Sequence, residues 1–371
     1  MEAGELITKK RNDQIKFKKK LIKEKKVLFA GIFILTVLLL ISMILSLLFG
    51  PVDITVFETF RVIYHNIFKL FIKSNISLSS GISNDIIWGI RFPRVIMAAV
   101  IGMGLSVIGV VMQAMVKNPL ANPYTLGVSS GASLGATFAI MIGVGSVFGP
   151  HFIGLSAFLG ALISSLVVYS IANIGAKSSS IKLLLSGMAV SALCSAFSSF
   201  IIFIANDAQG MRTLTFWLMG SLVSATWDNI LLPAVILIAG GLYFLSQFRN
   251  LNMMLLGDES AITLGSDLNF YRKIYIVITA LMTGMVVYVA GTIGFVGLII
   301  PHIVRAVVGT DHKKLIVFSG LTGAIFLIWT DVLARSLLQG TEMPIGIITS
   351  LLGAPFFIWI LIRKTYGFGG N

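Results

Sequence analysis

Long uninterrupted apolar runs are the feature of this sequence that most restricts its fold. A helix of roughly 20 residues crosses a hydrocarbon core about 30 Å thick, and runs of about this length recur along the chain. Because 56% of the residues are apolar and only 12% are charged, polar groups are too few to cover a water-soluble globule. The runs do not alternate with polar residues, so they predict helices rather than barrel strands. We therefore expect an all-α membrane protein.

Ten runs are long enough to predict about ten transmembrane helices. The eighth is short and rich in glycine. The predicted spans are residues 27–49, 95–116, 124–144, 152–174, 181–205, 230–246, 274–290, 293–308, 315–333 and 345–362.

The distribution of Lys and Arg predicts the orientation of these spans. Ten basic residues precede the first span, and the loops on the same side also carry more Lys and Arg than the opposite loops. We therefore predict a basic cytoplasmic tail at 1–26, a permease domain at 27–362 and a short cytoplasmic tail at 363–371. We attribute the net charge of +13 to the orientation of the spans and to attraction by anionic membrane lipid. Nucleic-acid binding is disfavoured, because the basic tail does not have the pattern of a folded nucleic-acid-binding module.

Acidic and basic residues are missing from the middles of the predicted spans. Asp331 and Arg305 fall near span ends, where we expect their side chains to reach the interface. A proton-coupled carrier needs a titratable group near the midplane, so the pattern disfavours one. An ion-coupled secondary transporter using backbone carbonyls stays open as the alternative.

The chain also lacks a nucleotide-binding motif of its own, because no Gly-Lys pair occurs in it. If ATP drives transport, separate subunits must bind it. We therefore expect this chain to be no enzyme, to bind no cofactor or metal, and to rely on ATP and Mg held by partner ATPases.

Three other features favour packing over chemistry. The string GVSSG at 127–131 matches a hydrolase nucleophile pattern, but Gly127, Gly131 and Gly135 form a smooth helix face for a neighbouring helix. The single Cys194 lies among small residues, and His302 has no second ligand at helical spacing.

Several motifs together resemble the FecCD-type permeases, the membrane subunits of importers for ferric siderophores, haem and cobalamin. They occur in the family's order and cover the chain from about residue 91 to 360. The strings are RFPR at 91–94, NPLANP at 118–123, LGVSSGA at 126–132, FWLMG at 216–220, GDESA at 257–261, GFVGL at 294–298, PIG at 344–346 and GAP at 353–355.

The resemblance implies a type II ABC importer permease fold in the bacterial cytoplasmic membrane. It further implies a second permease subunit, as a homodimer or heterodimer, with the translocation path along their interface. Two cytoplasmic ABC ATPases and an extracytoplasmic substrate-binding protein would complete the complex.

The polar stretch 247–273 predicts short helices on the cytoplasmic surface, with Gly257 closing one of them. The resemblance implies that this stretch couples the spans to the ATPases. An ordinary connecting loop is the alternative, because such caps occur in any short helix. The predicted coupling residues are Gly257, Asp258, Glu259, Ala261, Leu264 and Gly265.

Arg91, Arg94 and Arg335 fall at predicted span ends on the outer face. Guanidinium groups bind carboxylates through paired hydrogen bonds, and the resemblance implies that these three receive acidic residues of the binding protein. Anchoring to lipid headgroups is the alternative.

Proline and glycine predict two irregular backbone segments. The second span should end and reverse near Asn118, whose amide can satisfy freed carbonyls, and glycines before Pro301 should soften the eighth span. Either segment could line or gate the path, and simple turn and kink chemistry is the alternative. The candidate path residues are Asn118, Pro119, Pro123, Gly294, Gly297 and Pro301.

Overall fold

The computed structural model describes residues 26–71, 81–122, 127–143, 149, 151–174, 180–257, 263, 268–338 and 341–363. Within these ranges the regular structure is helical and contains no strand. After a first helix at Lys26–Ser46, the labelled elements are α2 Val56–Phe71, α3 Ile82–Asn84, η1 Asp85–Arg91, α4 Phe92–Val116, α5 Val128–Met141, α7 Phe152–Ala172, α8 Ser180–Ala205, α9 Ala208–Leu218, α10 Trp227–Ser246, α11 Phe248–Leu256, α13 Leu268–Ala290, α14 Val296–Val308, α15 His312–Ser336 and α16 Ile345–Arg363.

Each of the ten predicted spans corresponds to an apolar helix. Seven of these helices are long and apolar enough to cross a membrane, and α5, α14 and the apolar part of α16 are shorter. The main difference lies at the second span, where α3, η1 and α4 form one 35-residue helical run starting at Ile82. Arg91 and Arg94 therefore lie inside a helix instead of preceding it.

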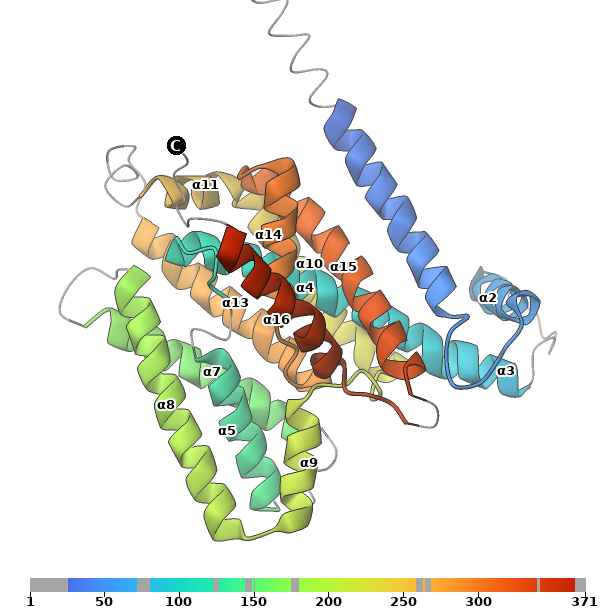
Figure 1. The fold of residues 1–371 in the computed structure, drawn as a ribbon, viewed down its shortest axis with the longest axis horizontal. Coiled ribbons are helices and arrows are strands. Elements are labelled where there is room, and N and C mark those ends of the chain that lie inside the picture. Colours follow the sequence, from blue (N-terminus) through green and yellow to red (C-terminus); the bar gives the residue numbers. More distant parts are fainter. Residues whose placement is uncertain are drawn as a thin grey trace, which may run out of the picture.

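The α4 helix forms the centre of the bundle. In the helical run that contains it, 83% of the residues in the apolar 18-residue stretch are buried. The α10, α13, α14 and α15 helices surround it (Figure 1). By contrast, the first helix lies along one edge and α8 lies at the opposite edge (Figure 1). Only 6% and 11% of the residues in their apolar 18-residue stretches are buried. These outer helices expose apolar side chains, which is the pattern that lipid contact requires.

Glycine permits the closest helix approaches, as the GVSSG string predicts. A Cβ atom on Gly131 would lie 2.4 Å from the carbonyl oxygen of Gly160, and one on Gly135 would lie 2.1 Å from that of Ser156. The α5 helix therefore packs directly on the backbone of α7, and the packing interpretation is confirmed for Gly131 and Gly135. Gly127 is instead the N-cap of α5, with a φ of 77°. Gly109 of α4 approaches Gly297 of α14 in the same way.

Among the described residues, and apart from α3 and η1 at the start of the long run, the helices α2, α9 and α11 lie outside the ten predicted spans. The α2 and α9 helices, which the sequence analysis did not predict, are amphipathic. The α11 helix falls within the stretch predicted to form short surface helices, and it lies across one end of the bundle in Figure 1. It ends at Gly257, whose φ of 107° favours glycine, so the predicted role of Gly257 in closing a helix is confirmed.

Candidate functional site

A cavity of about 560 Å³ lies where four segments that are distant in sequence converge. Its walls come from α5, the end of α9, the segment between α13 and α14, and the first turns of α16. The lining is uncharged and combines small, hydroxyl and apolar side chains, so it offers shape and weak polar contacts rather than a strong binding group. The lining residues are Ser129, Leu218, Met219, Thr292, Gly294, Gly346, Ile347, Ser350 and Leu351.

Hydrogen bonds to backbone carbonyls hold these walls together. The amide of Gly346 donates to the carbonyl of Met219 at 3.0 Å, and the amide of Ile345 donates to that of Gly220 at 3.1 Å. The hydroxyl of Thr292 donates to the carbonyl of Leu218. A Cβ atom on Gly346 would lie 2.2 Å from the Met219 oxygen, so this close approach requires glycine. The start of α16 is therefore fixed to the end of α9.

The predicted path residues fall into separate places. Gly294 lines the cavity, whereas Gly297 packs against Gly109 and Pro301 is buried within α14. Asn118 and Pro119 lie at the far end of α4.

Pro123 lies outside the described residues. The side-chain oxygen of Asn118 accepts a hydrogen bond from the Leu120 amide at 2.9 Å. This contact satisfies a backbone donor in the turn, whereas the sequence analysis expected the Asn118 amide to serve freed carbonyls.

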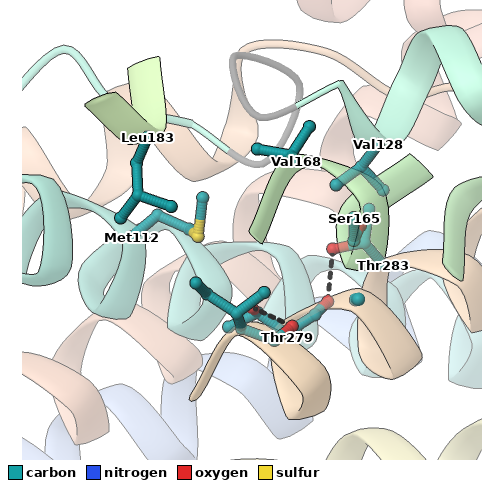
Figure 2. A pocket seen from close by; sticks show the side chains of 9 residues that line it. Met112, Val128, Ser165, Val168, Leu183, Thr279 and Thr283 are labelled. Carbon is teal, nitrogen blue, oxygen red and sulfur yellow. Dashed lines mark hydrogen bonds between the residues drawn. The ribbon is translucent and has the colours of Figure 1, made fainter. Parts of the chain in front are cut away.

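A second pocket, shown in Figure 2, has about 10 Å³ of space and lies among α4, α5, α7, α8 and α13. Its hydroxyl groups bond within their own helices: Thr279 donates to Tyr275, Thr283 to Thr279, and Ser165 to Ala161. Such a space holds one water molecule at most. It is therefore a packing gap and not a substrate site.

A buried ion cluster joins α4 to α15. The Nε atom of Arg94 lies 2.8 Å from one carboxylate oxygen of Asp331, and the Nε of Arg335 lies 3.5 Å from the other. Nη1 of Arg94 also binds Glu342 at 2.7 Å, and the Glu342 side chain is 36% exposed. The expectation that Asp331 reaches the interface is wrong, because its side chain is 1% exposed and held between two arginines.

Two of the three arginines predicted to dock a partner also hold the end of the first helix. Nη1 of Arg91 donates to the carbonyl of Leu47, and Nη2 of Arg335 donates to that of Ser46, each at 2.7 Å. The last carbonyls of a helix have no partner within the helix, and cations stabilise this end. Arg91, Arg94 and Arg335 are all at most 5% exposed, so the structure brings them together but directs them into the protein. Their docking role stays a prediction.

The predicted coupling residues are described only in part. Gly257 lies within the described residues, beside Lys117 at the end of α4. Asp258, Glu259, Ala261, Leu264 and Gly265 lie outside them. On the same side of the bundle, Arg305 of α14 donates to Gln113 of α4 at 2.7 Å. No group of His, Cys, Asp and Glu able to hold a metal occurs in the described part of the chain.

Sequence reasoning missed Glu342 and most of the cavity. The signal was present, because four of the strings that carried the family resemblance meet there: Ser129, Met219, Gly294 and Gly346 each come from a different one. A single sequence shows such strings but not their convergence. Glu342 is an acidic residue between two spans, and nothing in its neighbours along the chain indicates the distant Arg94.

The model of the FecCD transport family matches residues 38–363. The chain belongs to the FecCD transport family. Among its FecCD relatives, the cobalamin import system permease protein BtuC of Halobacterium salinarum is 41% identical over 74% of this chain and 73% of its own length. The hemin transport system permease protein HmuU of Yersinia pestis is 37% identical over 76% of this chain and 86% of its own length.

The fold of this FecCD chain also matches a solved structure. An inward-facing conformation of a metal-chelate type ABC transporter aligns with a TM-score of 0.75 at 31% identity, covering 90% of this chain and 99% of that chain. The predicted all-α fold of an ABC importer permease is thereby confirmed, and the chain is a multi-pass transport permease.

Proposed function

We propose that this chain is the membrane-spanning subunit of an ATP-driven importer that carries a metal chelate, namely a ferric siderophore, haem or cobalamin. The observation that supports this most directly is the uncharged cavity of about 560 Å³ at the convergence of α5, α9 and α16. A bulky chelate must be released after each cycle, so a wall without strong binding groups suits transport better than storage. The names of the cobalamin and hemin relatives agree with such cargo.

We infer that two permeases, identical or different, face each other across the translocation path. Each subunit would supply one wall, and the exposed Leu351 on the cavity side of α16 gives that wall an apolar border. Gly294 lines this wall. Of the predicted path residues within the described part of the chain, it is therefore the one that we retain.

We place the termini and α11 in the cytoplasm, where the segment after Gly257 would contact two ATPase subunits. The concentration of basic residues before the first span supports this orientation. The ATP and Mg would be bound by those subunits.

We place the Arg94 and Glu342 cluster on the outer face, where a substrate-binding protein would dock. Because the guanidinium groups are buried, an incoming carboxylate would meet the cluster at its exposed member, Glu342. Docking would therefore exchange one carboxylate for another on Arg94.

Reconstitution in proteoliposomes tests the proposal. The permease would be assembled with its ATPase and binding protein and supplied with cyanocobalamin, hemin or ferrichrome in turn. Uptake of one probe that requires ATP and stops with vanadate is the expected result. Uptake driven by a proton or sodium gradient without these partners would instead establish the secondary transporter.

A further inference from the structure

The structure contains a polar cluster at the end of the bundle opposite Arg94, and neither the family motifs nor the proposed site includes it. It joins α11 to the beginning of α15 through Asn252, Asp311 and His312. The side-chain oxygen of Asn252 accepts from the backbone amide of His312 at 2.9 Å and lies 2.7 Å from its Nδ1. The Asn252 amide donates to Asp311 at 3.0 Å. One asparagine therefore makes three contacts across two helices.

The cluster holds α15 at its first turn. Asp311 is the N-cap of α15, because its carboxylate also accepts from the amide of Lys313 at 3.2 Å. His312 is 1% exposed, so the contact to Asn252 is sheltered from water. Asn252 accepts both contacts from His312 there, and its amide donates to the carboxylate of Asp311, a charged acceptor that forms a stronger hydrogen bond than a neutral one. These contacts therefore connect α11 directly to the N-terminus of α15.

The α11 helix is itself fixed to the bundle and leads directly into the predicted coupling segment. Its Leu251 and Met254 side chains are fully buried, while Gly257 ends it in a backbone conformation that favours glycine. Force applied beyond Gly257 would therefore reach Asn252 within two helical turns.

The α15 helix then spans the distance to the ion cluster. From His312 to Asp331 it extends about 28 Å at the usual helical rise, without an internal proline. At its far end, Asp331 binds Arg94 and Arg335, and Arg94 binds Glu342 before α16. One continuous helix thus has a polar clamp at each end.

We propose that Asn252 is a positioning residue that links α11 to α15, so that α15 transmits movement between the coupling segment and the Arg94 cluster. The meaning of this movement, a link between ATP hydrolysis and the binding protein, rests on the proposed function. The link itself rests on the contacts of Asn252, Asp311 and His312.

The test measures how strongly the binding protein on one side stimulates ATP hydrolysis on the other, using the complete complex in nanodiscs. Asn252→Leu should lower this stimulation by between about twofold and thirtyfold while the ATPase subunits still co-purify. The matched control is Asn250→Leu, because Asn250 lies on the same helix but bonds to Gln247 and Tyr275 instead of α15. The control should keep the stimulation of the wild type.

A charge exchange separates transmission from simple loss of stability. Asn252→Asp would place two carboxylates together and should reduce stimulation. Adding Asp311→Asn should restore it, because an asparagine at position 311 can donate to the new carboxylate and still cap α15.

Stimulation equal to the wild type in Asn252→Leu, or an equal loss in Asn250→Leu, would overturn the inference. A wild-type complex that shows no stimulation at all would contradict the proposed function first.

Discussion

The guanidinium group of Arg94 and the carboxylate of Asp331 form a buried ion pair, with 2.8 Å between Nε and Oδ1. Their side chains are 6% and 1% exposed, although 237 residues separate them in the sequence. The pair fixes α15 against α4 near the C-terminal end of the first helix. Because each charge is removed from solvent, each depends on the other.

Removal of the carboxylate should therefore destabilise the protein strongly. We expect Asp331→Asn to lower the free energy of unfolding by about 3–5 kcal/mol, because Arg94 and Arg335 then lose their shared counter-ion in a buried place. Thermal unfolding of the detergent-purified permease measures the change. Asp228→Asn is the control, since Asp228 is exposed in the first turn of α10 and should cost less than about 1 kcal/mol. Equal stability of the two variants would contradict the role given to Asp331.

Neutralising Glu342 should strengthen docking of the binding protein. Glu342→Gln removes the carboxylate that competes for Arg94, and this partly exposed pair contributes modestly, so we expect up to about fivefold tighter binding. Binding to nanodisc-embedded permease at low and high salt measures it. Glu58→Gln on the exposed part of α2 should leave the affinity unchanged. Weaker binding by Glu342→Gln would show that this carboxylate assists docking.

A methyl group at position 346 should disturb the cavity wall. In Gly346→Ala the new Cβ would lie 2.2 Å from the Met219 oxygen, so α16 must move away from α9 at a cost of about 1–3 kcal/mol. We expect reduced uptake in proteoliposomes and a lower unfolding temperature. Gly241→Ala is the control, because Gly241 lies in α10, does not line the cavity, and has no atom within 4 Å of its added Cβ. If both variants transport equally well, the contact between α9 and α16 does not shape the path.

A charge in the predicted coupling segment should uncouple transport. Ala261→Glu places a carboxylate where we propose that an ATPase groove receives small and apolar residues, so desolvation of the charge opposes that contact. We expect normal membrane insertion, loss of uptake and weaker co-purification of the ATPase. Full uptake by this variant would refute the coupling role of the segment.

The sequence was most informative about the transmembrane helices. Their apolar runs are local features, so α7 and α8 could be placed from the sequence alone. The glycines at 131 and 135 also predicted a close helix contact, although not that α7 supplies it. The sequence was least informative about α2 and α9. These amphipathic helices are too short and too polar to be recognised as transmembrane spans.

The surroundings of charged residues near helix ends were not visible in the sequence, and the expectation for Asp331 was wrong for this reason. Asp331 and the three arginines look like interfacial groups in a linear sequence, because their distance from the middle of a span is all that a sequence shows. Whether such a group meets water or a counter-ion depends on the neighbouring helices. The extension of α4 back to Ile82 and the return of the chain through Glu342 supply those neighbours.

The sequence by itself determined that the chain is a bundle of apolar helices, because helix length and apolar content are set residue by residue by the bilayer. The likeness to transport permeases came from the order of its short motifs. Only the tertiary structure decided which residues meet: the four cavity walls, the Arg94 cluster and the Asn252 clamp. Each of these depends on side chains or carbonyl groups from segments far apart in the chain, and their contacts form only when the helices pack.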